Sequence, residues 1–314
     1  MNYEIFKMNN IISTITPTTI DGFLLFYTSE DRSFNILNHL SLINILPSNI
    51  IIISPNNISN EEIKSLELKF NIHINILIIS YDYFDKLIPY LKEINGYLNR
   101  KNTIGLDITC MPIPLFTQIL NFIYKHHKNI KIISYYSEPN HYSLDKLFDY
   151  TAYDGEIDIK VIPGFEGKTS KLNEDKRVLF YILGFEMKYL NKIIPQEINP
   201  DVIVPINGFP SFFPKYKDIA LINNDANYYE QDIEIIFAEA NNPFNTYNQL
   251  IQLKNKFSTY FIDIIPAGTK PMALGACLFA IKSKNNDVRI LFPFPSKYKI
   301  KQSHGSGKAW EYQI

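Results

Sequence analysis

The chain has 314 residues, of which 46% are hydrophobic and 20% are charged, and its 31 basic and 32 acidic side chains give a formal net charge of -1. So apolar a composition excludes an intrinsically disordered chain, because enough surface can be buried to offset the entropy lost on folding. The balanced charge excludes the generally basic surface of a nucleic-acid-binding protein. We therefore expect no direct nucleic-acid binding unless a local basic patch provides it.

The cysteine and targeting signals point to a cytoplasmic protein. Cys110 and Cys277 are the only cysteines, and with six histidines they are too few for a disulfide scaffold or a cysteine-rich zinc site. The first ten residues lack a basic segment followed by an apolar core, and no apolar run approaches the roughly 20 residues of a membrane span. We expect no metal, no bound cofactor and no membrane partner.

In the first half of the chain, short runs of Ile, Leu, Phe and Tyr alternate with longer segments of helical periodicity. Such continuous apolar runs are typical of strands buried on both faces of a parallel sheet. The pattern predicts strands at 23–28, 50–54, 74–80, 103–109 and 130–136, and helices at 32–42, 60–70, 83–98 and 114–125.

The second half repeats this alternation. The pattern predicts strands at 177–183, 202–206, 233–239, 260–265 and 288–292, and helices at 186–194, 246–257 and 271–284. Between the halves, 156–167 has the pattern of an edge strand leading into a turn, and 168–176 that of a polar linker. We therefore predict an N-terminal half over 1–167 and a C-terminal half over 168–314.

The two halves also align at a constant offset of 156 residues. Glu30 falls on Glu186, Arg32 falls on Lys188, and Asp107 falls on Asp263. Constant spacing near both ends of the halves indicates an internal duplication. The predicted fold class is α/β, with two tandem Rossmann-like, doubly wound, parallel-sheet halves that form a pseudo-dimer around a shared cleft.

The segment after the predicted strand 260–265 carries the most chemistry. Gly268, Thr269 and Lys270 lie between that buried strand and a helix that Pro271 would begin. Free amides at a helix start favour an anion, and the lysine would add positive charge to a phosphate held there. The alternative is an ordinary helix start, with Thr269 as its N-cap and Lys270 in solvent.

This loop resembles that of CARF-type Rossmann-like domains, which sense cyclic oligoadenylates in CRISPR-linked and related prokaryotic defence proteins. Their loop often follows the pattern Asp/Asn-x-Thr-Gly-Gly-Thr-Lys-x-Met. Gly268, Thr269, Lys270 and Met272 match that pattern, whereas Ala267 departs from it. The resemblance implies a ligand-sensing domain that works in pairs and acts through a partner or effector subunit.

Further polar residues follow the other predicted strands. Glu30 with Arg32 and Gly184 with Glu186 stand just past the first strand of each half, where they could bind ribose hydroxyls and phosphate or serve as solvated helix-start charges. The remaining candidates also follow predicted strands, where ordinary loops contain the same residue types. They are Thr109, Asn207, Gly208, Ser211 and Glu239.

Glycine is scarce, with 12 in the chain, so glycines beyond strands are informative. Gly184, Gly208 and Gly268 all lie in the second half, which we therefore expect to hold the working site. For the C-terminal stretch 303–308 two interpretations stay open, a lid over the cleft or a tail pinned by Trp310 and Tyr312.

The predicted function is the binding or sensing of a nucleotide or another phosphorylated small molecule. Gly268, Thr269 and Lys270 would hold the anion, and Asp263, Glu186 and Glu30 would orient polar groups. Such a protein could be a subunit of an antiviral defence system whose output lies in a partner chain. The alternatives are an enzyme that processes nucleotides or nucleosides with Glu186 or Glu239 in the cleft, and a structural subunit whose cleft has decayed.

Overall fold

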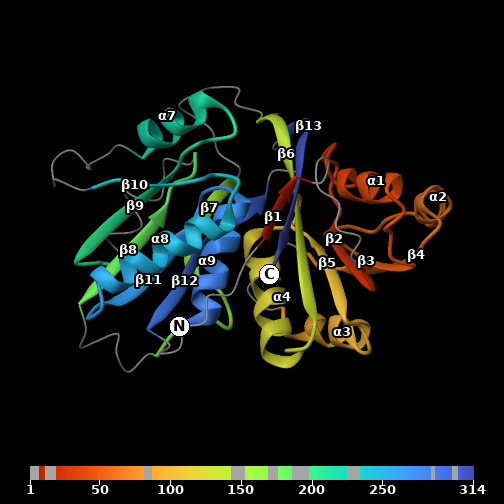
Figure 1. Cartoon of the computed structure of the whole chain (residues 1–314), viewed down its shortest axis with the longest axis horizontal. Coiled ribbons are helices and arrows are strands. Elements are labelled where there is room, and N and C mark those ends of the chain that lie inside the picture. The colour runs from red at the N-terminus through yellow and green to blue at the C-terminus, as the bar shows by residue number, and fades with distance from the viewer. Residues whose placement is uncertain are drawn as a thin grey trace. The chain divides into compact units, whose positions relative to one another are not determined.

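The computed structural model describes residues 7–10, 19–80, 87–142, 153–168, 176–185, 198–224, 234–283, 287–298 and 303–314. The chain divides into two compact units. Unit 1 comprises Met1–Ser143 with Ile300–Ile314, and unit 2 comprises Leu144–Lys299. Each unit is built on one mostly parallel sheet with helices packed against it (Figure 1). The α/β fold class is therefore confirmed.

Unit 1 contains a sheet with the strand order β1-β13-β6-β5-β2-β3-β4. Its strands are β1 (Lys7–Asn10), β2 (Gly22–Phe26), β3 (Asn49–Ser54), β4 (His73–Ile78), β5 (Thr103–Asp107), β6 (Lys131–Tyr142) and β13 (Ser303–Gln313). Its helices are α1 (Asn35–Leu42), α2 (Asn60–Phe70), α3 (Ile88–Leu98) and α4 (Ile113–His126).

Unit 2 contains a sheet with the strand order β10-β9-β8-β11-β12-β7. Its strands are β7 (Tyr153–Val161), β8 (Arg177–Ile182), β9 (Val202–Gly208), β10 (Ile236–Ala238), β11 (Phe261–Pro266) and β12 (Val288–Tyr298). Its helices are α7 (Pro214–Asn223), α8 (Pro243–Lys256) and α9 (Lys270–Lys282). Every strand predicted for the two halves overlaps one of these strands or one of unit 1. The predicted helix 186–194 lies outside the described residues.

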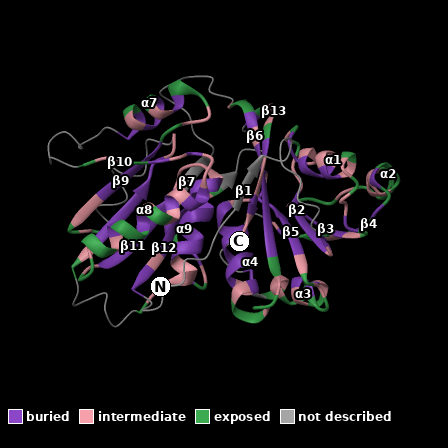
Figure 2. Ribbon diagram, viewed as in Figure 1, coloured by how far each residue is buried: buried purple, intermediate pink, exposed green. Residues whose placement is uncertain are grey.

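Burial of the central strands explains why their sequences are continuously apolar. Every residue of β2, β8 and β11 is buried apart from Arg177 at the start of β8 (Figure 2). In unit 2, α8 and α9 cover one face of the sheet, where Leu250 and Met272 pack on Phe180. Helix α7 covers the other face, where Ala220 packs on Tyr181. Helices on both faces make this sheet doubly wound.

Helix α7 was not predicted from the sequence. Its buried residues follow helical spacing, but Asn223 is one of them, while the neighbouring Ile222 is 50% exposed. The polar residue on the buried side and the apolar residue on the solvent side obscure the amphipathic pattern.

The five parallel strands have the same spatial order in both units. Numbered along the chain within each unit, they run 3-2-1-4-5, as β4-β3-β2-β5-β6 and as β10-β9-β8-β11-β12. This common order supports the internal duplication. The order reverses between β2 and β5 in unit 1 and between β8 and β11 in unit 2, and these are the topological switch points. The pseudo-dimeric arrangement stays a prediction.

The antiparallel strands β7 and β13 are exchanged between the units. Strand β7 follows β6 in the chain but pairs with β12, whereas β13 follows β12 and pairs with β6. Strand β7 thus belongs to unit 2 and β13 to unit 1, so the two units do not coincide with the predicted halves 1–167 and 168–314. The stretch 303–308 belongs to β13, so neither a lid nor a tail describes it, and the predicted edge strand 156–167 corresponds to β7 in the sheet of unit 2.

The strand register changes one equivalence between the halves. Asp107 pairs with Leu25 in unit 1. The offset of 156 carries Leu25 to Tyr181, and Tyr181 pairs with Ile265. Asp107 therefore corresponds to Ile265 in the sheets, two residues beyond Asp263. Asp107 and Asp263, which the offset of 156 aligns, thus lie at different heights in their sheets.

Glu138 of β6 gives the fold a pH dependence. Burial raises the pKa of Glu138 above its ordinary value, although the hydrogen bond that Trp310 Nε1 donates to its carboxylate at 2.6 Å acts in the opposite direction. An acid whose pKa is raised by folding contributes stability below its ordinary pKa of 4.5, and that contribution is lost as the pH rises through the folded value.

We therefore expect the wild-type chain to lose stability relative to Glu138→Gln as the pH rises from about 4 to 7. Urea unfolding of both chains across this range measures the difference. Parallel stability curves would show that the ionisation of Glu138 does not affect folding.

Candidate functional site

Two glycines bring the loops at the switch point of unit 2 into backbone contact. Gly184 follows β8 and Gly268 follows β11, which is the adjacent strand. A Cβ atom at Gly184 would overlap the carbonyl oxygen of Ala267, and one at Gly268 would lie 3.1 Å from the carbonyl oxygen of Leu183. Glycine is therefore required sterically at Gly184, and the two loops can approach only because both positions lack side chains.

Gly208 brings the end of β9 to the same place. A Cβ atom at Gly208 would lie 3.2 Å from Ala240 Cβ and 3.4 Å from the Met272 sulfur in the first turn of α9. A Cβ at Gly268 would lie 3.5 Å from that same sulfur. The structure thus brings Gly208 and Gly268 beside the first turn of α9, and Gly184 against the loop that leads into it.

Thr269 is the N-cap of α9. Its hydroxyl accepts a hydrogen bond from the Met272 amide at 3.4 Å and donates one to the carbonyl oxygen of Ala240. Lys270 is the first helical residue, and Pro271, in the first turn, has no amide hydrogen. Thr269 satisfies the Met272 amide and Pro271 has none, so an anion beside Lys270 would be held by the positive end of the helix dipole and by the lysine, not by a set of free amides.

The other candidate residues of unit 2 have structural partners. The Asn207 amide donates to the carbonyl oxygen of Lys217 at 3.1 Å and ties β9 to α7. The Ser211 hydroxyl donates to the carbonyl oxygen of Phe213 at 2.6 Å, just before α7 begins. Both side chains shape the loop between β9 and α7.

Glu239 and Glu186 were the predicted catalytic candidates. The half-buried Glu239 follows β10, and its carboxylate accepts a hydrogen bond from Asn242 Nδ2 at 3.0 Å. Asn242 also caps α8, so it fixes this carboxylate at the carboxyl edge of the sheet. Glu186 lies outside the described residues.

Asp263 lies inside the sheet of unit 2. Its side chain is 0% exposed, and its carboxylate forms ion pairs with Arg177 at 2.5 Å and with Arg289 at 2.7 Å. The two arginines belong to β8 and β12, the neighbours of β11. The carboxylate therefore joins three strands, three residues before the end of β11.

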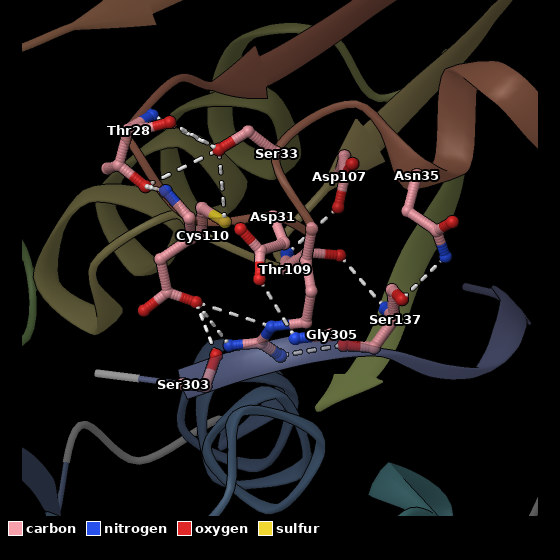
Figure 3. Close-up of polar contacts among 12 residues, drawn as sticks. Thr28, Asp31, Ser33, Asn35, Asp107, Thr109, Cys110, Ser137, Ser303 and Gly305 are labelled. Carbon is pink, nitrogen blue, oxygen red and sulfur yellow. Dashed lines mark hydrogen bonds and ion pairs between the residues drawn. The ribbon is translucent and has the colours of Figure 1, made fainter. Parts of the chain in front are cut away.

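The switch point of unit 1 holds a dense polar cluster beyond the ends of β2 and β5 and beside the middle of β6 (Figure 3). Arg32 is 5% exposed, and its guanidinium donates to Glu30 Oε2 at 2.9 Å and to the carbonyl oxygen of Ser137 at 2.8 Å. Burial lowers the pKa of Arg32, but Tyr136, Cys110 and Glu30 together raise it above its ordinary value, so the guanidinium is charged.

The same cluster includes the predicted Thr109 together with Ser303 and Gly305, which were not among the candidate residues. Thr109 Oγ1 accepts a hydrogen bond from the Ser137 amide at 2.9 Å, Ser303 Oγ donates to Glu30 at 2.5 Å, and the Gly305 amide donates to Asp31 at 3.0 Å (Figure 3). Ser303 and Gly305 begin β13, and no sequence signal relates them to residues more than 270 positions earlier. Glu30, Arg32 and Thr109 were predicted to bind a ligand, but they form hydrogen bonds within unit 1. Glu30 also accepts the bond from Ser303 that holds the start of β13.

Within the described ranges, no three or more His, Cys, Asp or Glu side chains form a group that could hold a metal ion. The helices of the described part of the chain include none that is long and apolar enough to cross a membrane.

Comparisons with known proteins identify no family. No protein-family model matches the chain, and no curated protein matches it. Among solved structures, the chain is similar to a universal stress protein from Archaeoglobus fulgidus DSM 4304, with 12% identity and a TM-score of 0.24 over 90% of this chain and 98% of that one. Because that TM-score is low, the fold assignment depends on the strand orders alone.

Proposed function

We propose that unit 2 binds a nucleotide or another phosphorylated small molecule at the carboxyl ends of β8, β9 and β11. The observation that carries the proposal is the close packing of Gly184 on Ala267, in the loop that leads to α9, and of Gly208 and Gly268 beside Met272 in the first turn of that helix. Open α/β sheets bind ligands at the switch point, and the glycines there let the loops that would form the site pack closely together.

The phosphate would lie at the start of α9. The positive end of the helix dipole and the Lys270 ammonium group both favour a negative charge at this position. Gly184 and Gly208 would act indirectly, because their missing side chains let the neighbouring loops pack closely at the edge of the sheet where the ligand would bind. Unit 1 serves as the scaffold in this proposal, because Glu30, Arg32 and Thr109 are engaged in its own loop contacts.

A sensing role in a prokaryotic defence system follows from the loop resemblance. Gly268, Thr269, Lys270 and Met272 match the CARF-type pattern, and cyclic oligonucleotides are therefore the first ligands to test beside mononucleotides. In this role the output would come from a partner chain.

A second candidate function is the turnover of the bound nucleotide. The carboxylate of Glu239 favours it, because Asn242 holds this group at the same edge of the sheet. Glu186 stays a candidate for the same role. Chromatographic analysis of nucleotides incubated with the protein tests turnover: products that disappear in Glu239→Gln or Glu186→Gln support an enzyme, and unchanged nucleotides support a binding protein.

Lys270→Ala is expected to weaken the binding of a phosphorylated ligand about tenfold or more, since a charge-assisted hydrogen bond contributes roughly 1.5–3 kcal/mol. Titration calorimetry with the nucleotide that gives the largest melting shift in a panel measures the change. Lys256→Ala is the matched control, because this exposed lysine lies at the far end of α8, where it forms a surface ion pair with Glu234 and lies over the Phe257 ring. Equal affinities of Lys270→Ala and the wild-type chain would refute the placement of the phosphate.

A further inference from the structure

A basic pocket lies at the amino ends of β5 and β6 in unit 1. It has a volume of about 490 Å³, and six of its ten lining residues are basic or histidine. They are Arg100, Lys101, Lys125, His126, His127 and Lys128. None of the ten is acidic. The chain's formal net charge of -1 conceals this local concentration of positive charge.

The positive charge of the basic pocket exceeds what the local backbone can neutralise. Helices α3 and α4 end there, and each helix carboxyl end carries roughly half a negative charge. Two such ends offset about one of the four Lys and Arg charges. Arg100, Lys125 and Lys128 form no ion pair within the described part of the chain, and Lys101 donates to the carbonyl oxygen of Asp21. About three charges thus face the pocket without an acidic partner among its lining residues.

Arg100 occupies a backbone conformation that disfavours it. Its φ is +66°, and the other non-glycine residues with positive φ in the described ranges are Asn44, Asn71 and Asn199. Asparagine tolerates the left-handed region, whereas a long side chain with a Cβ is strained there. Arg100 holds this conformation in the turn that ends α3, where the Lys101 amide donates to the carbonyl oxygen of Leu98 at 3.2 Å, and we take its charge on the pocket as the reason for an arginine at this position.

We infer that the basic pocket binds a chain of phosphate groups, as found in nucleoside triphosphates and in inorganic polyphosphate. A volume of 490 Å³ lies within the range of small-ligand sites. Three or more adjacent phosphates match the excess of about three positive charges. A nucleic acid would need a basic stripe along the surface, whereas these charges gather in one hollow.

The basic pocket is independent of the proposed site in unit 2. It lies at the amino ends of its strands, opposite to the switch point of unit 1, and it shares no residue with the loops around α9. Failure of one proposal therefore leaves the other standing.

Calorimetric titration of the full Lys270→Ala chain with inorganic tripolyphosphate and with ATP tests the inference, because this background removes the lysine of the unit 2 site. Adding Lys125→Gln and Lys128→Gln should weaken binding of both probes at least tenfold, and raising the salt concentration should weaken it further. The matched control adds Lys64→Gln and Lys69→Gln, which remove the same charge from α2 of the same unit. Equal affinity for the two probes assigns the contacts to the phosphates, and tighter ATP binding adds a contact to the nucleoside; both support a polyphosphate site.

Arg100→Gly separates a ligand-binding role from a structural one. It should weaken tripolyphosphate binding while raising the melting temperature of unit 1 by about 2–4 °C, because glycine relieves the strained φ. The inference is overturned if neither probe binds, if the control pair weakens binding as much as the pocket pair, or if an oligonucleotide binds where tripolyphosphate does not.

Discussion

Asp263→Ala is expected to lower the free energy of unfolding of unit 2 by about 3–5 kcal/mol. The carboxylate is fully buried and pairs with Arg177 and Arg289, whose side chains are only 19% and 15% exposed. Removing it leaves two largely buried guanidinium groups without their counter-ion. The cost is far larger than that of an exposed ion pair, because water cannot replace the lost partner.

Urea denaturation followed by circular dichroism measures this effect. Asp158→Ala is the matched control, since Asp158 pairs with Lys160 on the surface and both side chains are about half exposed. The control should change the stability by less than about 1 kcal/mol. Similar effects of the two substitutions would show that Asp263 does not join the strands as the structure indicates.

Truncating the chain after Lys299 is expected to unfold unit 1 and to leave unit 2 folded. Strand β13 pairs with β6 on one side and with β1 on the other, and its Ala309 and Tyr312 are fully buried. Loss of one large buried aromatic alone costs about 3–5 kcal/mol. The truncation removes the strand pairing as well, so the total approaches the 5–15 kcal/mol by which a domain is stable.

Hydrogen exchange of peptides from both units distinguishes this outcome from general unfolding. Peptides from β2, β5 and β6 should lose protection, whereas peptides from β8 and β11 should keep it. Lys308→Ala, an exposed position in β13, is the control that leaves the strand in place. In the chain, β13 directly follows unit 2, yet it pairs within the sheet of unit 1. Loss of protection in β8 and β11 would therefore contradict the exchange of β7 and β13.

Local sequence signals predicted most of the regular structure. Helix α2 occupies 60–70, the range predicted for it, because Ser59 caps its first turn and the left-handed Asn71 ends it. Continuous apolar runs located the central strands, since those strands are buried on both faces. Gly184, Gly208 and Gly268 were predicted to mark a working site in the second half. The structure shows that they allow close packing at the switch point of unit 2, where there is little room for a Cβ, and the ligand site stays a prediction.

The remaining features depend on contacts between distant residues. Local periodicity does not reveal the exchange of β7 and β13, because the pattern of either strand is compatible with pairing in either sheet. The bond between Ser303 and Glu30 joins residues 273 positions apart. The basic pocket is formed by two turns, one at Arg100 and one at Lys128. The net charge of the chain does not reveal their positive charge, because acidic residues elsewhere balance it. Such features follow from tertiary packing, and composition does not reveal them.

The central claim is that a phosphorylated ligand binds at the carboxyl ends of β8, β9 and β11. Hydrogen exchange with and without the tightest-binding nucleotide of the panel tests it most directly. The account predicts that the ligand protects the peptides around Gly184, Gly208 and Gly268. Protection confined to unit 1, with those three peptides unchanged while the nucleotide is bound, would contradict it.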